Sequence, residues 1–125
     1  MKIETAVLTK NLPREIHVWL QSLNLTYKMN NPKRDLANGW LFAEILQRYY
    51  PEEVEMYQYD NGFKLEKKRN NWEHLQKFFK RKGMPVSFAD WDPVMHCAPN
   101  ASYELLKKFY VLLTGREIND ELQPI

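Results

Sequence analysis

The sequence has few of the features that crosslink a small protein or anchor it in a membrane. Cys97 is the only cysteine among 125 residues, so no disulfide can form within the chain, which suits a reducing compartment. No apolar run approaches the roughly 18 residues of a membrane-spanning helix. The first residues, MKIETAVLTKNLP, alternate charged and apolar positions instead of forming the apolar stretch of a signal peptide. We therefore expect a soluble cytoplasmic protein without membrane insertion.

Signals of catalysis are equally scarce. The three histidines fall on different predicted helices, and no Cys, His and carboxylate set has metal-ligand spacing. His96 and Cys97 are adjacent, so on a helix their side chains would diverge by about 100°. The four glycines are isolated, which excludes the glycine-rich motifs that cradle phosphates. We predict that the chain is not an enzyme and uses no metal or cofactor.

Positive charge, by contrast, is concentrated in one segment. From Lys64 to Gly83, the run KLEKKRNNWEHLQKFFKRKG holds eight basic residues against Glu66 and Glu73, a net charge of +6, while the whole chain carries +2. The remainder therefore sums to −4. Such a field attracts an extended acidic partner, which is a polymer, a nucleic acid or a membrane surface.

Apolar residues recur at helical spacing through most of the chain, and no alternating strand or internal repeat is evident. Asp35 is a candidate cap for the second helix, although Asn38-Gly39 weakens its start and the regular helix is expected after Gly39. An Asn61-Gly62 turn is expected at the end of an irregular connector. The pattern predicts an all-α domain with four main helices and one or two short ones. The helices are expected over 13–23, 35–50, 64–83 and 87–96 and from residue 100 or 102 to 114, with loops over 25–35 and 52–63. One domain over 12–118 is expected, with an N-terminal extension (1–11) and a C-terminal tail (119–125).

The basic segment reads as an amphipathic helix. Phasing at 100° per residue predicts one apolar stripe and an opposite face with Lys77, Lys80 and Arg81. The predicted stripe consists of Leu65, Trp72, Leu75, Phe78 and Phe79. A core helix with a solvated basic side is the plain alternative, but eight cations in twenty residues favour a functional surface. Lys67 and Lys68 fall near the helix start, where cations oppose the helix dipole.

Two of the three acidic partners are disfavoured by the same phasing. The aromatic residues lie on the apolar stripe and do not alternate with the lysines, so a base-stacking platform for nucleic acid is not evident. A helix lying on a membrane needs exposed apolar residues, whereas this stripe is expected in the core. Helical phasing alone does not identify the acidic partner.

Several stretches together resemble a known family. They are PREIHVWLQSLNL, DLANGWLFAEILQRYYP, VEMYQY, NNWEHLQKFFKRKG and CAPNASYELLKKFYVLLTGREI, in that order. They resemble the calponin-homology (CH) fold, in particular its divergent sperm-flagellar and ciliary branch. The resemblance covers about residues 12–118 and implies a compact helical domain with a cytoskeletal role. It implies localisation to the cytoskeleton of a cilium or flagellum, including the axoneme.

The resemblance also implies a partner and a site. The segment from Tyr49 to Gly83 is similar to end-binding proteins, in which a proline, lysines and an FKR-x-G ending frame the microtubule-contacting surface. The microtubule-binding residues expected on this basis, with the adjacent Arg69 and the loop cations, are Lys33, Arg34, Lys64, Lys67, Lys68, Arg69, Lys80, Arg81 and Lys82. The acidic connector with Glu52, Glu53 and Glu55 departs from that pattern and is expected to limit affinity. F-actin binding and an adaptor role among ciliary proteins are the alternatives, and the tail REINDELQPI has no heptads, so a monomer is expected.

Overall fold

The computed structural model describes residues 13–27 and 31–117, and every regular element in these ranges is helical. This confirms the predicted all-α fold with four longer helices. The elements are α2 (Arg14–Ser22), α3 (Pro32–Asp35), α4 (Trp40–Tyr49), the 3₁₀ turn η1 (Met56–Gln58), α5 (Leu65–Lys82), α6 (Phe88–Met95) and α7 (Ala101–Thr114). The proposed extension and the proposed tail both lie outside the described residues, so these boundaries stay predictions.

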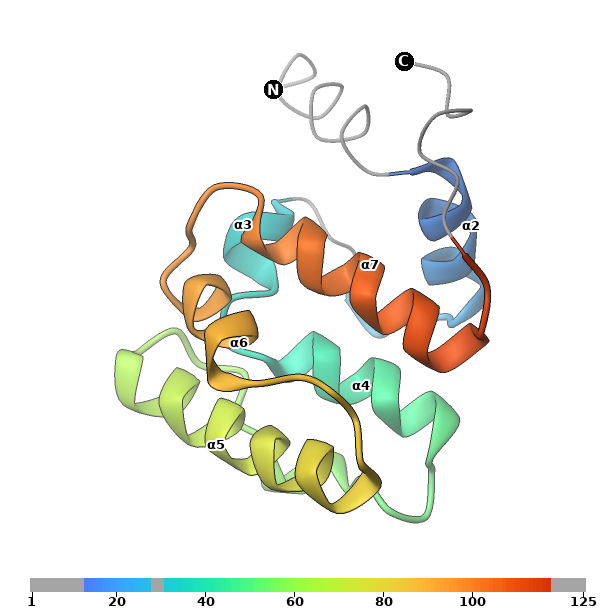
Figure 1. The fold of residues 1–125 in the computed structure, drawn as a ribbon. Helices are drawn as coiled ribbons and strands as arrows, with labels where there is room; N and C mark the ends of the chain where they lie inside the picture. The colour runs from blue at the N-terminus through green and yellow to red at the C-terminus, as the bar shows by residue number, and fades with distance from the viewer. Residues whose placement is uncertain (1–12, 28–30, 118–125) are drawn as a thin grey trace.

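The core is centred on Phe42 of α4, which is fully buried. Its ring packs against Trp72 of α5 at 5.4 Å and against Phe109 of α7 at 4.8 Å. Phe79 of α5 also meets Phe109, with ring centroids 5.9 Å apart. These contacts join three helices that are far apart in sequence, and α5 forms the edge of the molecule opposite α2 (Figure 1).

Gly39 fixes the start of α4, as the sequence predicts. Its φ of +80° is a left-handed conformation that side chains rarely adopt, and the helix begins at Trp40. A Cβ at this position would lie 3.1 Å from Leu75 Cδ1 and 3.1 Å from Trp72 Cε2. Glycine therefore also allows α5 to approach the backbone closely.

The segment before Gly39 differs from the prediction. Asp35 does not cap a following helix; it ends the short helix α3, and its Oδ2 accepts a hydrogen bond from the Asn31 N–H at 3.0 Å. The expected loop therefore contains a helical turn, because Pro32 takes the first helical position that proline favours. Asn61-Gly62 also forms no turn, and the segment is irregular up to the start of α5.

The remaining helix ends agree with the sequence. α5 ends at Gly83 in a left-handed conformation with φ of 70°, and α7 ends in the same way at Gly115. Ser87 and Asp90 form a capping box at the start of α6. Trp72 and Trp91 stack with ring centroids 5.7 Å apart, so Trp91 of α6 also belongs to the core.

Candidate functional site

α5 separates its cations into two groups. With about 1.5 Å of rise per residue, Arg69 and Lys80 lie roughly 16 Å apart along the axis. We call the group at the start of α5 the N-terminal patch: Arg34, Phe63, Lys64, Leu65, Lys67, Lys68 and Arg69. The C-terminal patch consists of Lys80, Arg81 and Lys82.

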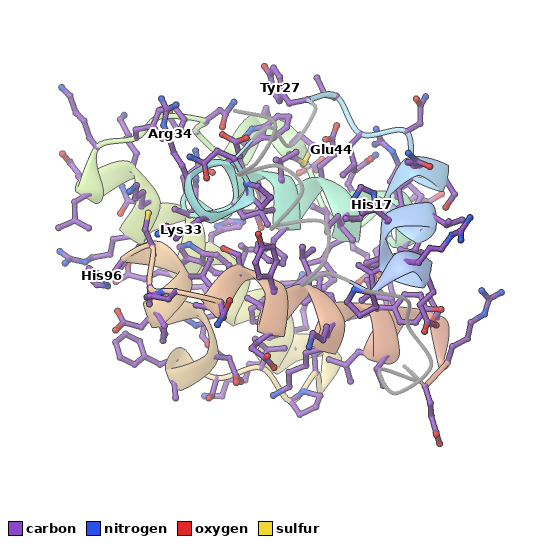
Figure 2. All side chains as sticks on the ribbon, turned by 90° about the horizontal axis from the view of Figure 1, so that it is seen from above. His17, Tyr27, Lys33, Arg34, Glu44 and His96 are labelled. Carbon is purple, nitrogen blue, oxygen red and sulfur yellow. The ribbon has the colours of Figure 1, made fainter. Side chains whose placement is uncertain are left out.

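Arg34 joins the N-terminal patch from α3. Its Cζ atom lies 4.7 Å from the centre of the Phe63 ring, a cation–π geometry. Lys33 precedes it on the same helical turn and is exposed, but the two side chains lie on different sides of α3 (Figure 2). The structure therefore brings Arg34, and not Lys33, to the start of α5.

The other cations of this patch differ in whether an acidic side chain pairs with them. Lys67 Nζ lies 3.2 Å from Asp60 Oδ2, and both side chains are about half exposed, so the pair is weak and screened. Within the described residues, no ion pair involves Lys64, Lys68 or Arg69. Their charge is available to a partner, although Lys68 is half-buried.

Two buried asparagines hold the segment that presents this patch. Asn71 of α5 donates from Nδ2 to the carbonyls of Asn38 (2.9 Å) and Asp60 (2.6 Å), and its Oδ1 accepts from the Asp60 N–H at 3.0 Å. Asn38 Nδ2 donates to Asn61 Oδ1 at 2.9 Å and to the Gly62 carbonyl at 3.0 Å. The segment leading into Phe63 is thus fixed to α5 and to the start of α4.

Neither asparagine is predicted from the sequence to be a buried hydrogen-bonding residue. Asn71 is 2% exposed and Asn38 is fully buried. The signal available was helical phasing, because Asn71 falls within the buried side of α5 next to Trp72. A polar residue at a core position needs hydrogen-bond partners, and irregular backbone nearby supplies them.

The C-terminal patch is partly neutralised. Lys82 Nζ lies 2.9 Å from Glu53 Oε2 and 4.8 Å from the centre of the Tyr50 ring. Arg81 lies over the Phe78 ring at 5.2 Å. Lys80 is exposed and has no ion pair in the part of the chain that the structure describes. The acidic connector therefore reaches this patch and reduces its positive charge.

The middle of α5 adds only modest charge. Lys77, Lys80 and Arg81 are exposed on the solvent side, as the phasing predicts, and Glu73 is exposed on the same helix. Burial, with repulsion from Lys77 and Arg81, lowers the pKa of His74 below its ordinary 6.5. His74 is therefore neutral at pH 7, and its Nε2 lies 2.7 Å from Gln58 Oε1.

Leu65 is the one member of the predicted core stripe that the structure places elsewhere. Trp72, Leu75, Phe78 and Phe79 are buried, but Leu65 is 47% exposed. Its position in the first turn takes it beyond the edge of the core. Phe63 beside it is 48% exposed, so the N-terminal patch is both basic and apolar.

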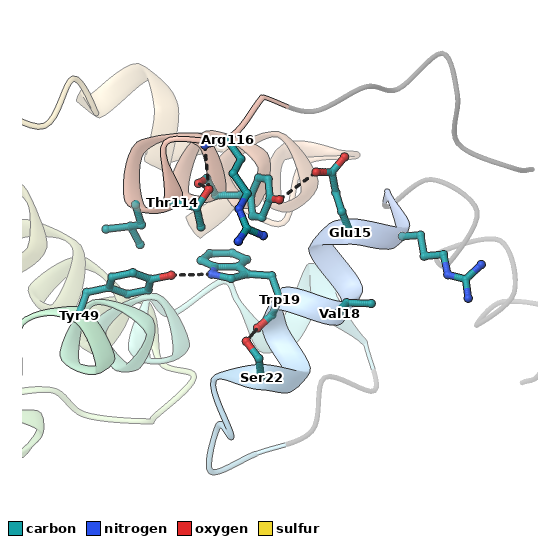
Figure 3. Close-up of a pocket in the computed structure, with 10 residues that line it drawn as sticks. Glu15, Val18, Trp19, Ser22, Tyr49, Thr114 and Arg116 are labelled. Atoms are coloured by element: carbon teal, nitrogen blue, oxygen red, sulfur yellow. Dashed lines mark hydrogen bonds between the residues drawn. The ribbon is translucent and has the colours of Figure 1, made fainter.

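A pocket at the opposite side of the molecule is a structural feature of α2, α4 and α7 (Figure 3). Its polar groups satisfy one another: Trp19 Nε1 donates to the Tyr49 hydroxyl at 2.8 Å, and the Tyr110 hydroxyl donates to Glu15 Oε2 at 2.9 Å. Across the described ranges, no group of three or more His, Cys, Asp or Glu side chains is placed to hold a metal ion. Nor does any helix there have the length and apolar character needed to cross a membrane.

Comparison with known proteins identifies the domain. Residues 16–111 match the family model described as "CH-like domain in sperm protein". The chain is 33% identical to sperm flagellar protein 1 of Homo sapiens over 86 residues, which is 68% of this chain and 36% of that protein. It is 32% identical to the protein of the same name from Mus musculus over 89 residues, with 68% and 37% covered.

The same name recurs in Xenopus laevis, at 30% identity over 90 residues. The chain spans less than two-fifths of the length of these curated relatives. The family match covers most of the described helices, from α2 into α7, and agrees with their all-α arrangement. The chain therefore belongs to the family of CH-like domains found in sperm proteins.

Proposed function

We propose that this chain is a non-enzymatic cytoskeletal module that binds microtubules through the cations of α5 and acts in a cilium or flagellum. The observation that carries the proposal is the net charge of +6 between Lys64 and Gly83 in a chain of +2. Membership of the CH-like family and the flagellar names of the relatives favour a filament over other acidic partners. A microtubule offers an extended acidic surface that such a field would steer onto α5.

The energetics favour many weak contacts over one strong contact. An exposed ion pair contributes only about 0–1 kcal/mol. Single Lys→Ala changes should therefore have small effects, and binding should weaken as the Debye length shortens to about 8 Å at physiological ionic strength. One such domain binds weakly alone, and a longer protein would gain avidity from a second contact.

The test is co-sedimentation of the chain with microtubules and, in parallel, with F-actin at low and physiological salt. Reversing three cations together (Lys67→Glu, Lys68→Glu, Arg69→Glu) should abolish pelleting with microtubules. The matched control reverses three cations on α2, on α7 and after α7: Arg14→Glu, Lys107→Glu and Arg116→Glu. It makes the same change in net charge and should pellet much as the original chain does.

Two results would count against the proposal. Retained binding by a folded triple reversal would contradict the site. Failure of the original chain to pellet with microtubules at low salt would contradict the function, and pelleting with F-actin alone would favour an actin-binding role.

An adaptor that binds another ciliary protein is the second candidate, and the acidic connector favours it. Tyr57 is 80% exposed, and its hydroxyl donates to Glu55 Oε1 at 3.0 Å. Exposed tyrosine is enriched at protein–protein interfaces, while the carboxylates around it oppose an acidic filament. Binding to neither filament at low salt is the outcome that favours this candidate.

A further inference from the structure

Two large apolar side chains are exposed within the N-terminal patch. Phe63 is 48% exposed and Leu65 is 47% exposed, on either side of Lys64. Single exposed apolar residues are ordinary on protein surfaces. This pair differs because it lies among cations that a charged partner would desolvate.

Phe63 is also held in position. The Arg34 guanidinium lies 4.7 Å from its ring centre, and Asn38 binds the two preceding residues through Asn61 Oδ1 and the Gly62 carbonyl. A side chain that is already ordered loses less conformational entropy when a partner covers it. The ring is therefore well suited to serve as a contact.

We propose that Phe63 and Leu65 form an apolar anchor that packs into the acidic surface of the microtubule, with Arg34, Lys64 and Lys67 as its charged rim. This inference rests on the microtubule-binding function proposed above and names the residues expected to contribute most to the binding free energy. Charge complementarity selects the occupant, because Arg34 lies over the Phe63 ring and four more cations (Lys64, Lys67, Lys68 and Arg69) lie within four residues of Leu65. Strong interface contacts are enriched in aromatic residues and arginine and are surrounded by weaker polar contacts.

The salt dependence of microtubule binding distinguishes the contribution of the apolar anchor from that of its charged rim. Ion pairs at a surface weaken as ionic strength rises, whereas burial of an aromatic ring is little affected. Phe63→Ala should weaken binding about 10- to 30-fold at every salt concentration and leave the salt dependence unchanged. Lys64→Ala should instead have a small effect that disappears at high salt.

The experiment measures microtubule co-sedimentation over a range of salt for the original chain, Phe63→Ala, Arg34→Lys and a control, Phe88→Ala. Phe88 is 60% exposed on α6, and its ring lies 4.8 Å from that of Trp91, so it resembles Phe63 in type and exposure but belongs to a different helix. Arg34→Lys keeps the charge but removes the planar group over Phe63, so we expect a smaller loss than for Phe63→Ala. Circular dichroism melting verifies that each variant is folded.

The outcomes are distinct. Loss of binding by Phe63→Ala at all salt concentrations, with Phe88→Ala unaffected, supports the anchor. Equal binding of Phe63→Ala and Phe88→Ala, while the triple charge reversal fails to bind, overturns the anchor and leaves the proposed function standing. Absence of microtubule binding by the original chain at low salt overturns both.

Discussion

Asn71 links the stability of the core to the shape of the candidate surface. Replacing it with alanine removes three hydrogen bonds and leaves the Asp60 backbone and the Asn38 carbonyl without this partner. We expect Asn71→Ala to lower the free energy of unfolding by about 2–3 kcal/mol, since unpaired buried polar groups are costly. Chemical denaturation measures this change.

The same variant should weaken microtubule binding although its charge is unchanged, because the Asp60 backbone loses its hydrogen bonds to α5. Asn38, which holds Asn61 and Gly62, also loses the hydrogen bond to its own carbonyl. Asn70→Ala is the matched control: Asn70 is the preceding residue on α5 and is exposed. We expect it to change stability and binding little. Equal effects of the two substitutions would show that the asparagine network does not position the patch.

Among the elements, α6 depends on its first turn. The Ser87 N–H donates to Asp90 Oδ2 at 2.8 Å, and Lys108 Nζ of α7 lies 3.1 Å from the same oxygen. Burial alone raises the pKa of Asp90, but these contacts outweigh it and hold the pKa below its ordinary value of 3.8. The carboxylate thus stabilises both the helix start and its packing on α7.

The pH dependence of stability follows from the lowered pKa of Asp90. Because the folded-state pKa of Asp90 is depressed, its contribution is fully present above the unfolded pKa and is lost as pH falls through the folded pKa. Asp90→Asn should lower stability by roughly 1 kcal/mol at neutral pH and make the loss of stability in acid less steep. Thermal melts at neutral and acidic pH test this.

Asp92→Asn makes the same chemical change on α6, at a carboxylate that lies 3.4 Å from His96 Nδ1. It should leave the steepness of the acid transition closer to that of the original chain. An identical acid profile for Asp90→Asn and the original chain would contradict the assigned role of Asp90.

Local chemistry explains how much of the fold was predictable. Gly39, Gly83 and the Ser87 cap act within a few residues, so the sequence predicts the corresponding helix ends. Asp35 was assigned to the wrong helix because its hydrogen-bond partner, Asn31, is the N-cap residue of the short helix α3. A four-residue helix is too short to produce an apolar period.

The candidate site was predictable only in part, because some of its contacts join segments that are distant in the sequence. Charge counting locates the cations of α5, but it does not show that Arg34 reaches Phe63 or that Glu53 pairs with Lys82. Both contacts join segments separated by 29 residues, and both depend on how α3 and the connector pack. Leu65 was misplaced because periodicity does not indicate where a helix extends past its core.

Across the whole molecule, the basic and acidic side chains are not fully separated. The cations lie at both ends of α5, and the connector places Glu53 2.9 Å from Lys82, with Glu55 exposed nearby in sequence. These carboxylates cancel part of the field at the C-terminal patch and would repel an acidic filament. Within the described residues, the N-terminal patch has one ion pair, the exposed Lys67–Asp60 contact. This patch should therefore contribute more than the C-terminal patch to steering a filament onto α5.

Neutralising the connector should consequently strengthen binding. In Glu53→Gln with Glu55→Gln, Lys82 loses its ion pair and the net charge rises by two, while glutamine can still accept the hydrogen bonds from Lys82 and Tyr57. We expect tighter microtubule co-sedimentation at low salt, with the gain shrinking as salt screens the surface. Glu104→Gln with Glu117→Gln raises the net charge equally, on and just after α7, and should gain less. Equal gains would mean that net charge alone drives association, and no gain from the connector variant would mean that this side of α5 faces away from the filament.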